Sequence, residues 1–96
     1  MLILVGYDVN TMDHEGQRRL RLVAKCCQDY GQRVQNSLFE CVVDGTQYTA
    51  LKYRLLQIVD LQKDSLRFYR LGKNYSSKVE HHGIKPSIDL EGTLII

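Results

Sequence analysis

The first side chain in this sequence that could do chemistry is Asp8. It follows a continuous apolar run, residues 2–5, and lies among the turn-forming residues that close that run. Uninterrupted apolar runs of this length are typical of strands buried on both faces. A carboxylate at the end of a central strand either caps the next helix or belongs to a functional site. The role of Asp8 therefore decides what the chain does.

Five basic residues gather between positions 14 and 36, where only two acidic residues oppose them. Three of them fall together on one face of a predicted helix. Such a face can follow a phosphate backbone or can simply be a solvated surface, and the spacing alone favours the solvated surface. No aromatic residues alternate with the basic ones, so any binding would be to the backbone and not to bases. The five are Arg18, Arg19, Arg21, Lys25 and Arg33, and Arg67, Arg70, Lys73 and Lys78 form a second cluster with the same two readings.

The histidines do not form a metal motif. His81 and His82 are adjacent, so in a strand they would project to opposite sides and could not share a metal. His14 is close in sequence to Asp8 and is a candidate for moving a proton there.

The cysteine pattern points to a reducing compartment. Cys26, Cys27 and Cys41 are odd in number and lack C-x-x-C spacing, which argues against a disulfide framework and a zinc knuckle. We expect them to be small core residues. No apolar run approaches the roughly 18 residues of a membrane span, and no charged segment precedes the apolar start as in a signal peptide. A cytoplasmic protein without a membrane partner is expected.

Length and composition indicate one small globular domain. The chain has 96 residues, of which 44% are hydrophobic and 25% charged. Burial is marginal at this size, so oligomerisation would help stability. The formal net charge of +2 is too small to predict a nucleic-acid partner by itself.

A first helix is predicted over residues 17–30. Leu20, Val23, Ala24, Cys27 and Tyr30 recur at helical spacing and form one buried face. The polar stretch before the helix offers two caps, at positions 11 and 13, and the glycine at position 31 ends it.

Residues 33–43 are rich in strand formers, but the Asn-Ser pair at 36–37 breaks their alternation. They form either one bent strand or two short ones. Asp44 and Gln47 then resemble a capping box, and a second helix is expected to about residue 59. Its apolar stripe is Tyr48, Leu51, Leu55 and Ile58.

The last third of the chain predicts a strand over residues 65–71, a turn over 72–74 and a further strand over 75–81. The end of the chain, 94–96, is apolar and needs a place to be buried. In so small a domain the edge of a partner's sheet is a natural place, so we expect a homodimer with exchanged C-terminal segments. The element order indicates an α+β sandwich with two helices on one face of an antiparallel sheet.

Four motifs carry a family likeness. They are YDV at 7–9, RVQNSLFEC at 33–41, YRLG at 69–72 and KPSID at 85–89. Together they resemble the CRISPR-associated protein two family, the small subunit of the spacer-acquisition machinery. The likeness covers essentially the whole chain, and the C-terminal pattern is similar to members that accompany type I-C systems.

The resemblance implies a ferredoxin-like βαββαβ fold with an extra C-terminal strand, residues 1–82 forming the domain and residues 83–96 a tail exchanged in a homodimer. It implies that two copies of Asp8, one per chain, face each other and hold a divalent cation, Mg²⁺ or Mn²⁺. It also implies cleavage of single-stranded RNA or double-stranded DNA, and a bridging role between integrase subunits. Ser37 belongs to the family motif. It either lies near the Asp8 cleft and contacts phosphate or, as is more common for a serine at a strand break, only satisfies the backbone.

Metal chemistry at Asp8 is physically reasonable. Mg²⁺ prefers oxygen ligands and keeps several waters, so two carboxylates related by a dyad are adequate where one is poor. The sequence thus favours a dimeric, magnesium-dependent phosphodiesterase with Asp8 as its catalytic and metal residue. The main alternative is a non-catalytic DNA scaffold bound to an integrase, and a toxin-like ribonuclease on the same fold is a third possibility.

Overall fold

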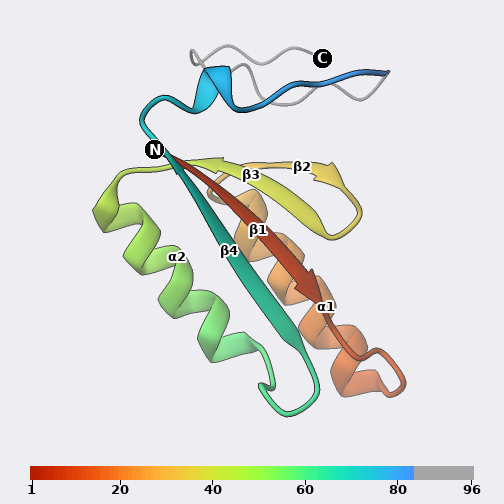
Figure 1. Cartoon of the computed structure of the whole chain (residues 1–96). Helices are drawn as coiled ribbons and strands as arrows, with labels where there is room; N and C mark the ends of the chain where they lie inside the picture. Colours follow the sequence, from red (N-terminus) through yellow and green to blue (C-terminus); the bar gives the residue numbers. More distant parts are fainter. Residues whose placement is uncertain (84–96) are drawn as a thin grey trace.

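The structure is a computed structural model and describes residues 1–83. A four-stranded sheet and two helices account for most of it (Figure 1). In chain order the elements are β1 (Leu2–Asp8), α1 (His14–Gln28), β2 (Gln32–Gln35), β3 (Leu38–Val42), α2 (Gly45–Ile58), β4 (Ser65–Gly72) and the short 3-10 helix η1 (Tyr75–Ser77).

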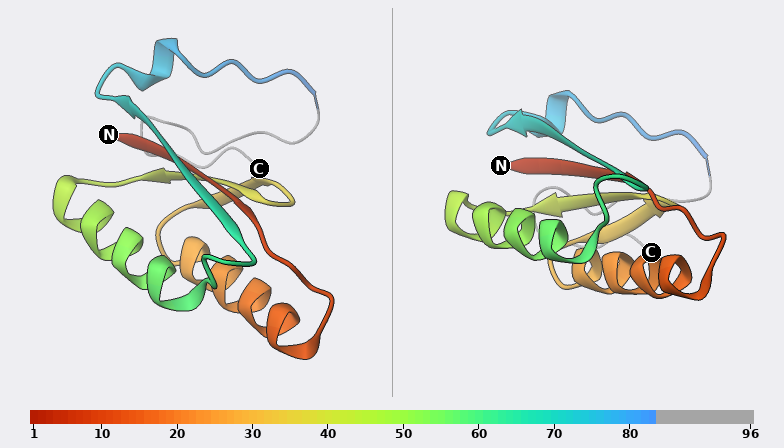
Figure 2. Two further views of the ribbon diagram at one scale, coloured as in Figure 1. Left: turned by 60° about the horizontal axis from the view of Figure 1, so that its bottom comes forward. Right: turned by 90° about the horizontal axis from the view of Figure 1, so that it is seen from below.

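The sheet has the strand order β2-β3-β1-β4, and every neighbouring pair is antiparallel. Both α1 and α2 pack on one face of it (Figure 2). The face turned away from these two helices is called the outer face below. This order and layering are those of the ferredoxin-like βαββαβ fold, so the α+β ferredoxin-like part of the prediction is confirmed.

The central strand β1 supplies the middle of the core. Ile3, Val5 and Tyr7 point toward the helices and are buried, whereas Leu4 and Gly6 face outward and are half-buried. Burial on both faces was expected of this strand, but only its helix side is uniformly covered by the described residues. Because side chains alternate along a strand, Asp8 shares the outer face with Leu4 and Gly6.

The ambiguous stretch after α1 is two strands joined in a hairpin. β2 and β3 pair with each other, and the two-residue turn between them is the Asn-Ser pair at 36–37. Phe39 in β3 is fully buried, and its ring stacks on that of Tyr7 with centroids 6.2 Å apart. The hairpin is therefore fixed to the core beside the end of β1.

Both helices begin where the sequence places a cap. The Asp13 carboxylate accepts a hydrogen bond from the backbone N–H of Gly16, and the pKa of Asp13 is lowered chiefly by that bond. At α2, Asp44 and Gln47 form the predicted reciprocal capping box.

A close approach explains the glycine after α1. A Cβ atom at Gly31 would lie 2.2 Å from the carbonyl oxygen of Glu40 and 2.6 Å from Cys41 Sγ. Its backbone is not in the left-handed region, so space, and not conformational freedom, requires glycine here.

The strand predicted over 75–81 is wrong. Gly72 adopts a φ of +75°, which turns the chain off the sheet, and η1 then forms with the hydroxyl of Ser77 donating to the Asn74 carbonyl. The Lys78 ammonium donates back to the Leu71 carbonyl at 3.1 Å. These local bonds replace a strand ladder in this segment. The predicted tail exchange concerns residues beyond 83, which lie outside the described residues.

Within residues 1–83, no helix combines the length and apolar character needed to cross a bilayer.

Candidate functional site

A depression of about 670 Å³ lies on the outer face of the sheet, where β1 ends. The ends of β1 and β4 and the β2–β3 turn contribute to its walls. It is lined by Gly6, Tyr7, Asp8, Gln35, Asn36, Ser37, Leu38, Ser65, Arg67 and Tyr69.

Asp8 lies exposed at the rim of this depression as the last residue of β1. It pairs in register with Ser65 of β4. Asp13, and not Asp8, caps α1, so the capping alternative for Asp8 is wrong. Among residues 1–83 nothing forms a hydrogen bond or ion pair with its carboxylate. Asp8 is thus a strand-end carboxylate left open to a ligand.

The β2–β3 turn is anchored to the residue before Asp8. The backbone N–H of Tyr7 donates to the Ser37 carbonyl at 3.1 Å, and the Tyr7 hydroxyl donates to the Asn36 carbonyl at 3.4 Å. Burial raises the pKa of Tyr7, so this phenol stays neutral. Ser37 is exposed and lines the depression, in agreement with its expected place near Asp8.

The sequence-based site residues did not include Arg67, which the structure places in the depression. It pairs in register with Gly6 and shares the outer face with it. The Arg67 guanidinium donates to the Tyr69 hydroxyl at 3.4 Å, and this bond raises the pKa of Arg67. The alternation of strand 65–71 places Arg67 and Tyr69 on one face, but only the β1–β4 register places that face beside Asp8.

A buried ion pair fixes the chain on both sides of the Asp8–Ser65 pair. The Asp64 side chain is fully buried and accepts from Arg19 Nε at 2.8 Å. It also accepts from the backbone N–H groups of Asn10 at 3.0 Å and Asp60 at 2.9 Å. Asn10 follows Asp8 by two residues and Asp64 precedes Ser65 directly, so one carboxylate holds both segments that leave the site.

The basic residues predicted to contact nucleic acid are not part of the depression. Arg18, Arg21 and Lys25 are exposed on α1, on the other side of the sheet from Asp8. Arg19 is held by Asp64, and the Arg33 guanidinium lies 5.3 Å from the centre of the Phe39 ring.

Other reactive groups lie away from the depression. His14 is the first residue of α1 and does not line it. Cys26, Cys27 and Cys41 are buried, as expected of core residues, and burial raises the pKa of both Cys27 and Cys41 to about 12. Among the described residues no group of three or more His, Cys, Asp or Glu side chains could hold a metal ion. Within that range, one chain supplies Asp8 alone to the depression as an acidic ligand.

Comparison with known proteins gives consistent matches. Residues 1–79 match the family model described as CRISPR associated protein Cas2. The chain is 64% identical over 95 residues to a CRISPR-associated endonuclease Cas2 of Halalkalibacterium halodurans, covering 99% of both chains. It is 62% identical over 96 residues to a CRISPR-associated endoribonuclease Cas2 of Nitratidesulfovibrio vulgaris, covering 100% of this chain and 94% of that protein. The crystal structure of Streptococcus pyogenes Cas2 superposes with a TM-score of 0.75 at 57% identity, covering 86% of this chain and 100% of that one.

Proposed function

The chain belongs to the Cas2 family of CRISPR-associated proteins, and on this premise we propose that it is a metal-dependent endonuclease acting in spacer acquisition. The single observation that carries the proposal is the exposed carboxylate of Asp8, which no residue of 1–83 engages, beside a polar depression. Phosphodiester hydrolysis needs a positioned water and charge neutralisation at phosphate, which a hard cation provides.

The residues present fit half of a magnesium or manganese site. Asp8 offers an oxygen ligand of the type that these ions prefer, and it is not engaged by any described residue. A second copy of the chain would supply a second Asp8, which makes the proposed active species a homodimer. A bound cation would supply charge neutralisation and a more acidic water.

The side chains around Asp8 have separate tasks in this proposal. The guanidinium of Arg67 attracts the phosphate of the substrate into the depression, and its bond to Tyr69 limits its motion. The hydroxyls of Ser37 and Ser65 are exposed donors for phosphate oxygens. These groups recognise the backbone, so either RNA or DNA is an acceptable substrate. The relatives, whose names include both endonuclease and endoribonuclease, are consistent with this breadth.

The proposed setting is the cytoplasm, in a type I-C-like adaptation complex with the CRISPR integrase subunit as partner. A second candidate function in the same setting is a non-catalytic DNA scaffold that bridges integrase subunits. The presence of only one acidic ligand among the depression residues of one chain favours this second candidate.

The test is cleavage of labelled double-stranded DNA and single-stranded RNA by wild-type protein and by Asp8→Asn. With Mg²⁺ or Mn²⁺ the variant should lose at least about 100-fold in rate, and EDTA should abolish cutting by the wild type. Asp29→Asn is the matched control, because Asp29 is an exposed carboxylate outside the depression. Equal cutting by Asp8→Asn and wild type would refute the nuclease proposal. Binding without cutting under every metal condition would favour the scaffold.

A further inference from the structure

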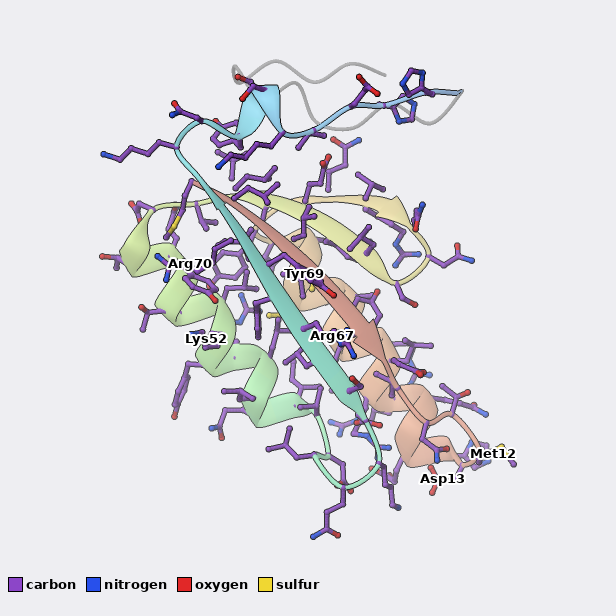
Figure 3. The ribbon with its side chains drawn as sticks, in the orientation of Figure 1. Met12, Asp13, Lys52, Arg67, Tyr69 and Arg70 are labelled. Carbon is purple, nitrogen blue, oxygen red and sulfur yellow. The ribbon has the colours of Figure 1, made fainter. Side chains whose placement is uncertain are left out.

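Two basic side chains from different elements converge on one tyrosine ring. The Lys52 ammonium, from α2, lies 4.5 Å from the centre of the Tyr48 ring. The Arg70 guanidinium, from β4, lies 5.7 Å from the same centre. Figure 3 shows Lys52 and Arg70 together on the α2 side of β4, whereas Arg67 and Tyr69 lie on the side away from that helix.

The fold fixes this arrangement. Tyr48 and Lys52 are four residues apart in α2 and therefore share a helix face. Arg70 pairs in register with Ile3, which points toward the helices, so Arg70 points the same way. The Tyr48 ring is held by an edge contact with Phe68, with centroids 5.8 Å apart. The patch formed by Tyr48, Lys52 and Arg70 is called the Tyr48 patch below.

The two charges of the Tyr48 patch are exposed and lack an acidic partner among residues 1–83. Arg54, on the same helix, provides the contrast. Its guanidinium lies 5.4 Å from the centre of the Tyr30 ring, but Asp29 neutralises it at 3.0 Å. Like charges over one ring repel each other, and the negative face of the ring offsets only part of that repulsion. An anion bound at this patch would relieve the rest.

We propose that the Tyr48 patch binds the phosphodiester backbone of a nucleic acid, as a contact separate from the Asp8 depression. Its position on the edge strand supports a polymer as the anion. Among residues 1–83, β4 is the last strand of the sheet, and it carries Arg67 on the outer face and Arg70 on the helix side. A strand of nucleic acid crossing that edge meets a positive charge on each face. The choice of nucleic acid as the polyanion rests on the proposed function, whereas the anion site itself does not.

The test is binding of a fluorescently labelled single-stranded RNA and a double-stranded DNA to the full chain, followed by anisotropy. EDTA is present so that no cleavage occurs, and the affinity is measured at several salt concentrations. The variants are Lys52→Gln, Arg70→Gln and the double variant. The control is Arg54→Gln, which removes a cation of the same helix that is already neutralised.

Each substitution in the Tyr48 patch should reduce the slope of log K against log salt by about 0.7 to 0.9. The affinity at low salt should fall about 3- to 10-fold for each positive charge that is removed. Arg54→Gln should leave both quantities at their wild-type values. The charge-preserving variants Lys52→Arg and Arg70→Lys should restore the wild-type slope, which separates loss of charge from damage to the fold.

A wild-type slope and affinity in the double variant would overturn the proposal, and so would an absence of any binding by the wild type. The outcome is distinguishable from that of the nuclease proposal. If Asp8→Asn cuts as well as wild type while the patch variants change the slope, the nuclease proposal fails and the patch stands. If cutting depends on Asp8 and the slope does not depend on the patch, only the patch fails.

Discussion

Replacing Asp64 by asparagine is expected to destabilise the fold by about 3 kcal/mol. The substitution keeps the shape of the side chain but removes its charge and turns one acceptor into a donor. At least one of the groups that now donate to Asp64, from Arg19, Asn10 or Asp60, then loses its acceptor. The lost hydrogen bond is buried, because the Asp64 side chain has no exposed surface and that of Arg19 is only 13% exposed.

The magnitude follows from this burial. Removing one partner of a buried ion pair typically costs about 3–5 kcal/mol, because the remaining charge is left uncompensated. The lower end applies here, since the slight exposure of Arg19 lets its guanidinium recover some hydration. For a domain of this size, about 3 kcal/mol corresponds to a fall in Tm of roughly 12–24 °C.

The assay is urea unfolding at pH 7 and fixed protein concentration, with Asp29→Asn as the matched control. Asp29 also accepts from an arginine, Arg54 at 3.0 Å, but the two side chains are 49% and 45% exposed. Exposed pairs contribute roughly 0–1 kcal/mol. Equal losses of unfolding free energy in the two variants would refute the reasoning, because burial would then make no difference.

The difference between wild type and Asp64→Asn should also depend on pH. Burial by itself raises the pKa of Asp64, but hydrogen bonds from Arg19 and from two backbone N–H groups outweigh it and hold the pKa below 3.8. Because the folded-state pKa is the lower one, the stabilisation is complete above the unfolded-state pKa. It is lost as the pH falls through the folded-state pKa. The free energies of unfolding of the two proteins should therefore differ by a constant amount from pH 5 to 8 and converge in acid. A difference that grows as the pH falls would contradict this.

Two further predictions concern packing. Gly31→Ala should cost at least about 2 kcal/mol in urea unfolding, because its Cβ would collide with the Glu40 carbonyl, whereas Gly45→Ala has nothing within 4 Å and should be neutral or slightly stabilising. Equal effects of the two substitutions would contradict the collision. The pKa of Cys27 and Cys41, raised by burial to about 12, should leave both thiols unmodified by a disulfide reagent at pH 8 until guanidinium unfolds the protein. Fast modification of the native protein would show that these thiols are accessible.

Local signals account for most of what the sequence could predict of the fold. Asp13 and Asp44 mark the helix starts because a cap bonds to backbone only a few residues away. The strand predicted over 65–71 is observed as Ser65–Gly72, since its alternation reflects one half-buried face that packs against the core. For the segment after it, residue alternation wrongly predicts a strand, because alternation does not reveal the positive φ of Gly72 or the hydrogen bonds around η1.

The candidate site was only partly predictable for a related reason. Asp8 and Ser37 could be found because a polar residue at a strand end and a break in a strand are local features. Arg67 and Tyr69 could not be assigned, because their place beside Asp8 depends on the register between β1 and β4, which are separated by most of the domain. Pairing between distant strands is decided by the packing of the whole sheet.

Asp64 shows how far this limit extends. In the sequence it is the last residue of a predicted polar turn, and no local feature distinguishes it from a solvated surface residue. In the structure it bonds to Arg19 of α1 and to the backbone of Asn10, 45 and 54 positions away in the chain. These bonds lie at the end of the sheet where Asp8 pairs with Ser65. The same buried carboxylate that stabilises the fold therefore also fixes the backbone from which Asp8 projects, so the geometry of the candidate site depends on a residue that does not line it.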